Sequence, residues 1–352
     1  PMITGDHKGE RLGACTDCRR FWAKFRANEI SEQEIGEVNN KLAPSAGTCM
    51  VMGTASTMAL CSEALGMMLP GGACTPAVMA DRLRHAEASG ARAVALAKEK
   101  LTPDKIMTPE AFENALRVLL AVGGSTNAIV HLTAMAGRLG IEIDLDAFDK
   151  MGRETPVLVD LKPTGQHYME DLEKAGGLVT ILREIRKLLN LDALTVTGDT
   201  LGENIKAAPP GWKQDVVRPF NDPIFKGGSI AVLRGNLCPE GAIIKQAAAS
   251  PKLMSHTGRA VVFESLEDLA NRIDDPKLDP VWKRCGELGM PVSIHVGDPR
   301  AFWLPYDETN ERWTELRDHR NWWFGDPAVH PPRMELLAAL SRVVARHPGT
   351  TF

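Results

Sequence analysis

Residues 47–60, GTCMVMGTASTMAL, form the stretch that says most about the fold of this chain. It is small, apolar and rich in hydroxyls, and it follows a polar segment over residues 1–45. We interpret it as a loop that leads into a buried helix ending near Gly66. The small neighbours of Cys49 would let a bulky group approach its sulfur, and the helix start would favour a thiolate. The alternative is a buried, inert cysteine.

The segments around this stretch alternate between helices and short apolar strands, which predicts an α/β fold. Thr108 is expected to cap a helix that has Pro109 in its first turn. The charged residues 29–34 are expected to open a short helix. Further helices are predicted over 76–99 and 177–189, and strands over 156–161 and 228–235.

Composition places the chain among ordinary globular proteins. Its 352 residues suggest about two domains, with 44% hydrophobic and 24% charged residues. The net charge of −4 argues against a general attraction to nucleic acid. No apolar run approaches the roughly 18 residues of a membrane helix, and the first residues lack the apolar core of a signal peptide. Seven cysteines, an odd number, favour a reduced cytoplasmic setting over a disulfide framework.

A second motif, Gly123-Gly124-Ser125-Thr126-Asn127, precedes a predicted helix over 128–139. Ser125 or Thr126 can cap that helix, and free N–H groups at its start can bind an anion. The motif is therefore either one wall of a substrate or carboxylate pocket, formed by Ser125, Thr126 and Asn127, or an ordinary glycine turn with a cap.

Three motifs in order carry a family resemblance: residues 44–58 with the Glu63-Ala64-Leu65-Gly66 segment, residues 123–128, and residues 235–242. Over about residues 1–279 the chain resembles the dihydroxy-acid and phosphogluconate (sugar-acid) dehydratases. The resemblance implies a hydro-lyase that removes water from a 2,3-dihydroxy carboxylate to give a 2-keto acid. It also implies a homo-oligomer with a small hydroxy-acid substrate. The net charge and the lack of a long apolar run predict no nucleic-acid or membrane partner.

The resemblance further implies an iron–sulfur cluster held by three cysteines, of which the third matches Cys49, and a nearby Mg²⁺. A Lewis-acidic iron would help the hydroxide to leave, and magnesium would stabilise the enolate-like charge. The family's earlier cysteine motifs would precede Pro1, and its serine base would follow residue 279. One expected cluster ligand of three is thus present, the catalytic residues are unknown, and the activity is expected to be incomplete in this chain.

Cys15 and Cys18 have the spacing of a metal or redox pair, but they do not match the family's cluster ligands. No second pair follows at the spacing of a zinc site, so the signal for a function is weak.

The last 73 residues differ in composition, because they hold five of the seven Trp. Residues 280–352 resemble part of a metal-dependent amidohydrolase with a TIM-barrel fold. A buried strand over 291–296 would place His295 at a metal-ligand position, or leave it as a lone strand-end histidine. Without barrel neighbours, the helix over 332–346 is expected to expose its apolar stripe.

We therefore predict three parts: a dehydratase-like α/β domain over 1–207, the start of a β-rich domain over 208–279, and a βα fragment of TIM-barrel type over 280–352. Two alternatives to the hydro-lyase remain. The chain could be a metal-dependent amidohydrolase or decarboxylase, or a hybrid without catalytic activity.

Overall fold

A computed structural model describes the chain except for residues 250–253, 256, 258–271, 290–291, 293 and 295–299. Its contacts divide the chain into two compact units, Pro1–Ala249 and Ser250–Phe352. The boundaries predicted after residues 207 and 279 do not coincide with this division, so the three-part organisation stays a prediction.

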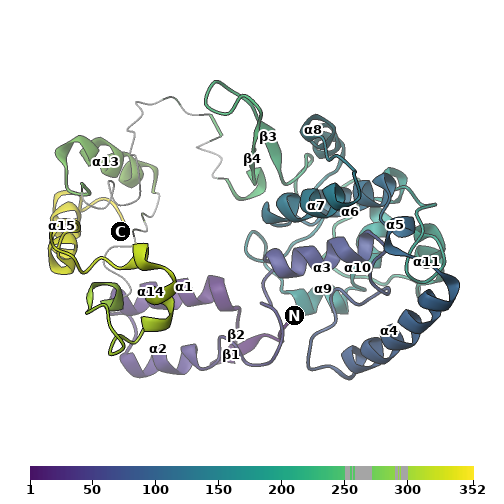
Figure 1. The fold of residues 1–352 in the computed structure, drawn as a ribbon, viewed down its shortest axis with the longest axis horizontal. Coiled ribbons are helices and arrows are strands. Elements are labelled where there is room, and N and C mark those ends of the chain that lie inside the picture. The colour runs from purple at the N-terminus through teal and green to yellow at the C-terminus, as the bar shows by residue number, and fades with distance from the viewer. Residues whose placement is uncertain (250–253, 256, 258–271, 290–291, 293, 295–299) are drawn as a thin grey trace. The chain divides into compact units, whose positions relative to one another are not determined.

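The first unit consists mainly of helices (Figure 1). Two antiparallel hairpins are its sheets in the described residues: β1 (Gly5–His7) with β2 (Glu10–Leu12), and β3 (Ala231–Leu233) with β4 (Ala242–Ile244). The α/β class therefore holds in a form that is richer in helix than the predicted alternation. The α-helices are α1 (Ala14–Arg26), α2 (Glu32–Asn39), α3 (Thr54–Ala64), α4 (Ala80–Glu99), α5 (Pro103–Ile106), α6 (Pro109–Ala121), α7 (Asn127–Arg138), α8 (Leu145–Glu154), α9 (Met169–Lys174), α10 (Leu178–Glu184) and α11 (Leu201–Ala207).

Helix α3 is buried, as the sequence predicts. Leu60 and Ala64 pack into one apolar cluster with residues of α9 and α10. Cys61 and Leu65 pack into a second cluster with residues of α6 and α7. A helix that is buried on two sides needs small or apolar side chains on both, and residues 54–65 supply them, with Glu63 as the charged exception. By contrast, α4 has no buried residue and lies at the edge of the unit (Figure 1).

Two helix starts that the sequence marks follow the capping rules. The Thr108 hydroxyl accepts the N–H of Ala111 at 3.4 Å, and Pro109 occupies the first turn of α6, as predicted. Ser31 caps α2 in the same way, with its hydroxyl 3.1 Å from the Glu34 nitrogen. These local signals lie within four residues of sequence and need no tertiary information.

The strand predicted over 156–161 does not form. Val157 and Val159 make isolated backbone pairs with Phe225 and Val217 respectively, although both valines are buried. The facing segment contains Pro219 and Pro223, which have no N–H to donate to a ladder.

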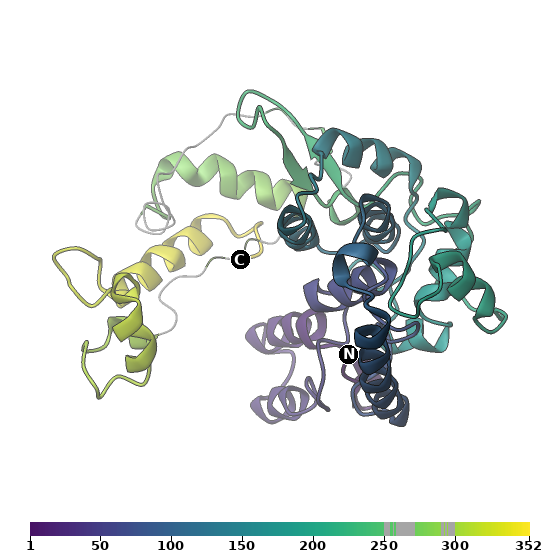
Figure 2. The same ribbon diagram turned by 45° about the vertical axis from the view of Figure 1, so that its right-hand side comes forward.

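Two further predicted elements are shorter than expected. The predicted helix over 177–189 ends at Glu184 and continues as a 3-10 turn, Arg186–Leu188. The strand predicted over 228–235 is reduced to β3, whose hairpin lies against α8 (Figures 1 and 2). An ion pair between Arg234 and Asp146 joins the hairpin to that helix.

The second unit contains α13 (Asp279–Leu288), α14 (Trp313–Asp318) and α15 (Arg333–Arg346). Helix α15 matches the prediction, but its stripe is not fully exposed, because Leu336 and Val343 are buried against Ile273, Leu278 and Trp282. These partners include residues before 280, which the prediction had assigned to another domain. Most of the predicted strand over 291–296, with His295, lies outside the described residues. The TIM-barrel resemblance of this part stays a prediction.

No described helix combines the length and the apolarity that crossing a bilayer requires.

Candidate functional site

The starts of α3 and α7 are held together by a buried threonine. The Thr57 hydroxyl donates to the Gly53 carbonyl at 2.8 Å and accepts the Ser125 N–H at 3.1 Å. Gly124 permits this approach, because a Cβ there would lie 2.6 Å from both the Thr57 methyl and Leu119. The two glycine-containing turns singled out in the sequence are therefore neighbours in space.

A polar network lies on the accessible side of this junction. The Thr54 and Ser125 hydroxyl oxygens are 3.0 Å apart. The Asn127 side-chain amide donates to Thr54 Oγ1 at 3.1 Å, and the Asn127 backbone N–H donates to Ser125 Oγ at 3.3 Å. Whichever hydroxyl donates to the other, the second keeps its proton for an outside acceptor.

Both helices begin here without full capping. Gly53 and Thr126, the N-cap residues of α3 and α7, make no side-chain hydrogen bond to their helices. At α7 the first three N–H groups nevertheless have acceptors, namely Ser125 Oγ and the Ser125 and Thr126 carbonyls. At α3 no acceptor is described for the N–H groups of residues 54–56, so an anion is stabilised near that helix start. Thr126 lies beside the network, but no bond that the structure describes gives its hydroxyl a part in it, and its role in substrate binding stays a prediction.

Cys49 lies in the loop just before α3 and is half-buried. Its carbonyl oxygen accepts a bond from the Ser56 hydroxyl at 3.5 Å, which ties the loop to the first turn of the helix. The structure thus brings Cys49 and residues 125–127 to the same helix start.

Cys15 lies near Cys49, which the sequence analysis did not anticipate. Burial, together with a hydrogen bond and repulsion from the Cys49 thiol, raises the pKa of Cys15. Asp17, in the same turn of α1, is buried, which by itself would raise its pKa. The Gly13 N–H at 2.6 Å, Arg20 and Lys162 nevertheless hold the pKa of Asp17 below its usual range. This carboxylate therefore anchors the start of α1 in its charged form.

A three-cysteine iron–sulfur cluster needs three thiolates around one point. Within the described residues, no group of three or more His, Cys, Asp or Glu side chains could hold a metal ion. This part of the chain therefore does not by itself fit the complete ligand set of a cluster or of Mg²⁺, and Cys49 can be only one contributor.

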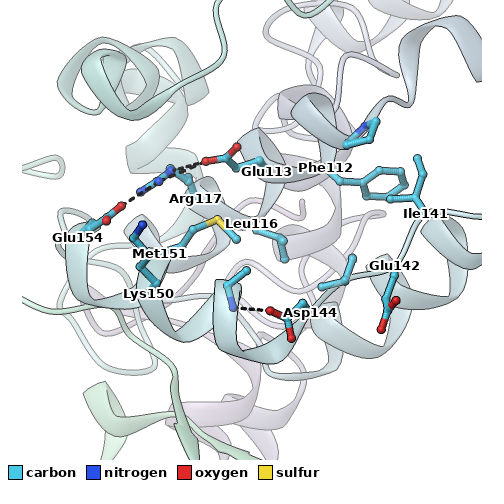
Figure 3. Close-up of a pocket in the computed structure, with 13 residues that line it drawn as sticks. Phe112, Glu113, Leu116, Arg117, Ile141, Glu142, Asp144, Lys150, Met151 and Glu154 are labelled. Carbon is cyan, nitrogen blue, oxygen red and sulfur yellow. Dashed lines mark hydrogen bonds and ion pairs between the residues drawn. The ribbon is translucent and has the colours of Figure 1, made fainter.

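A separate groove of about 330 Å³ lies between α6 and α8 (Figure 3). Arg117 spans its wall and pairs with Glu113 at 3.2 Å and with Glu154 at 3.0 Å. These three charged side chains already neutralise one another, so they offer little free charge to a ligand. We therefore do not assign the reaction to this groove.

Comparison with known proteins matches the chain to one family over the segments that contain these motifs. The family model described as "Dihydroxy-acid/6-phosphogluconate dehydratase N-terminal" matches residues 1–204, and the corresponding C-terminal model matches residues 215–283. The chain belongs to the dihydroxy-acid/6-phosphogluconate dehydratase family. Both the Cys49 loop and the residues 123–127 turn lie within the N-terminal match.

Relatives in this family include enzymes for sugar acids and for dihydroxy acids. An L-arabinonate dehydratase of Rhizobium leguminosarum is 44% identical over 306 residues, covering 85% of this chain and 53% of the relative. A dihydroxy-acid dehydratase of Caldicellulosiruptor bescii is 45% identical over 275 residues, covering 78% of this chain and 50% of the relative. The chain thus spans about half the length of these relatives. The similarity to the L-arabinonate dehydratase covers 85% of the chain, whereas residues 1–279 make up only about 79% of it. This similarity therefore extends beyond residue 279.

The sequence analysis missed Thr54 and Thr57 as site residues, although both lie in the quoted stretch. A hydroxyl in the first turn after Gly53 was the signal that could have identified them. His295, the proposed metal ligand of the tail, lies outside the described residues.

Proposed function

We propose that this chain contributes the carboxylate-binding face of a hydro-lyase that dehydrates a 2,3-dihydroxy acid to a 2-keto acid. The observation that supports this is the uncapped start of α3, which meets the Ser125–Asn127 hydroxyl and amide network beside the Cys49 loop, within the part of the chain that matches the family. The proposal includes an iron–sulfur cluster bound in part by Cys49, and Mg²⁺. The described residues do not supply the remaining ligands of the cluster or those of Mg²⁺.

The chain's own groups would bind and orient the acid. Backbone N–H groups at the start of α3 would face the carboxylate, where their partial positive charge is most favourable. The free hydroxyl proton of the Thr54–Ser125 pair would donate to a carboxylate or hydroxyl oxygen. Asn127 holds both hydroxyls in place through its two hydrogen bonds.

The names of the relatives suggest the substrate class. Arabinonate is a five-carbon aldonate, and it contains the 2,3-dihydroxy carboxylate unit that dihydroxy-acid dehydratases are named for. We propose that this shared unit, rather than the rest of the carbon chain, is what the network recognises.

Titration of L-arabinonate into the full chain under reducing conditions tests the proposal. Isothermal calorimetry should detect binding of the aldonate, and weaker or no binding of arabinitol, which lacks the carboxylate. Thr54→Val should weaken aldonate binding about tenfold or more, because a hydrogen bond to a charged group contributes about 1.5–3 kcal/mol.

Thr133→Val is the matched control, because Thr133 is exposed on α7, away from the helix start. It should leave the binding constant unchanged. If Thr54→Val and Thr133→Val bind arabinonate equally well, or if arabinitol binds as tightly as the aldonate, this assignment of the site is wrong.

A further inference from the structure

Helix α4 lies at the edge of the first unit, and arginine side chains attach it to the rest of the unit (Figure 1). Arg82 donates to the Gly72 carbonyl at 2.9 Å and to the Thr75 carbonyl. Ten residues further along the helix, Arg92 donates to the Val196 carbonyl. These contacts define the inner face of α4, and the other side of the helix is turned away from the unit.

The outward side of α4 carries an apolar stripe along its whole length. Its residues recur every three or four positions, so they share one side of the helix. None of them is charged and all are exposed, with Leu83 at 74% and Val94 at 57%. Exposed apolar patches that are rimmed by polar residues mark contact surfaces. We call this set the outer stripe; it consists of Met79, Leu83, Ala86, Gly90, Ala93, Val94 and Ala97.

Gly90 lies in the middle of the outer stripe, where nothing in the described residues requires a glycine. A Cβ built there would meet no described atom within 4 Å outside its own stretch of helix. Glycine destabilises a helix interior relative to alanine. Its usual benefit is that another backbone can approach closely. At Gly90 that backbone would have to come from outside the described part of this chain.

The sizes of the side chains complement one another around Gly90. If two α4 helices pack antiparallel with Gly90 opposite Gly90, Leu83 of one copy faces Ala97 of the other, and Val94 faces Ala86. Each large side chain then lies against a small one, and the contact has the twofold symmetry of an isologous dimer. A parallel pair would instead place Leu83 against Leu83 and Val94 against Val94, which would hold the two backbones apart at Gly90.

We propose that the outer stripe is a dimer contact, in which the α4 helices of two copies of this chain pack antiparallel around a twofold axis at Gly90. The stripe is about 27 Å long and about 10–12 Å wide, or roughly 300 Å² per copy. A stable complex buries about 800 Å² per partner, so the dimer is weak and reversible. The inference is independent of the proposed function, because α4 supplies no group to the site around Thr54 and Ser125.

Sedimentation velocity of the full chain under reducing conditions, from about 1 to 300 µM, tests the contact over the range of a weak complex. The weight-average mass should rise with concentration toward that of two chains. Gly90→Glu and Gly90→Lys each place two like charges at the axis, so each should raise the dimer dissociation constant about tenfold or more. An equimolar mixture of these two variants should regain the dimer, because opposite charges then meet at residue 90.

Ala91→Glu is the matched control, because Ala91 is exposed on the same helix but lies off the outer stripe. It should dimerise as the wild type does. Leu83→Glu and Ala97→Lys should each weaken the dimer, and their mixture should regain it, because the two positions face each other only in the antiparallel order. All substituted positions are exposed, so the far-ultraviolet circular dichroism of every variant should match that of the wild type.

A wild-type chain that stays monomeric up to about 300 µM would overturn the proposal. A Gly90→Glu chain that dimerises as tightly as the wild type would also overturn it, because the contact would then lie elsewhere on the chain. No regain in the Gly90→Glu and Gly90→Lys mixture would rule out the axis at residue 90, and no regain in the Leu83→Glu and Ala97→Lys mixture would rule out the antiparallel order. Arabinonate binding enters none of these measurements, so failure of the proposed function leaves them intact.

Discussion

Glu63 is the buried carboxyl whose ionisation should control the stability of the first unit. It lies on α3 and is 7% exposed. Its two oxygens accept the N–H groups of Gly71 at 2.8 Å and Ala73 at 2.9 Å. Burial raises the pKa of Glu63 to about 7, with a further contribution from Glu173 that the two backbone bonds oppose.

The magnitude follows from linkage. Below the unfolded pKa of 4.5, Glu63 is protonated in both states and has no effect on the pH dependence. Between pH 4.5 and 7 the unfolded chain loses this proton while the folded chain keeps it, so the free energy of unfolding falls as pH rises. At 1.36 kcal/mol per pKa unit, the loss from Glu63 amounts to about 3 kcal/mol across this window and stays constant above it.

Urea unfolding of the wild-type chain and of Glu63→Gln, followed by circular dichroism at pH 5 and pH 8, measures this loss. The substituted amide would lose one backbone hydrogen bond at both pH values. The informative quantity is therefore how the difference in free energy of unfolding between the two proteins changes with pH. The free energy of unfolding of Glu63→Gln, relative to that of the wild type, should rise by about 2–3 kcal/mol from pH 5 to pH 8. The same difference for Glu87→Gln, at an exposed position on α4, should not change with pH. Parallel pH profiles for wild type and Glu63→Gln would refute the argument that Glu63 is buried with a raised pKa.

Two further substitutions test close packing and capping. Gly13→Ala would place a Cβ against Tyr168 and Val51, and should lower the free energy of unfolding by about 1–3 kcal/mol; an unchanged urea midpoint would contradict the described contact. Thr108→Ala should cost about 1 kcal/mol through loss of the α6 cap, whereas Thr108→Ser should retain most of the stability, and equal urea midpoints for the two variants would show that the cap contributes nothing.

Local rules predicted the parts of the fold whose causes are local. Thr108 caps α6 and Ser31 caps α2 because a hydroxyl there reaches an N–H three residues away. The loop and helix around Cys49 were predicted for a related reason, since residues 54–65 suit a helix that is buried on two sides. In each case the pattern and its physical cause occupy the same short stretch.

The failures have causes that lie far away in the sequence. Residues 156–161 have the composition of a buried strand, but the segment facing them contains Pro219 and Pro223 and cannot form a ladder. The stripe of α15 was expected to be exposed, but Ile273 and Leu278 cover Leu336 and Val343. Neither outcome can be derived without knowing which segments meet.

The same reasoning explains why the site was only half predicted. Residues 47–60 and 123–127 each have a pattern typical of a helix start, but only Thr57, bonded to both turns, makes them one surface. Cys15 and Cys18 were judged as a pair because they are neighbours in sequence. In the structure, Gly13 lets the start of α1 approach the Cys49 loop closely, because a Cβ at residue 13 would lie 2.5 Å from the Tyr168 ring and 2.8 Å from a Val51 methyl. The surroundings of Cys15 are therefore set by a loop 34 positions along the chain rather than by Cys18, its neighbour in sequence.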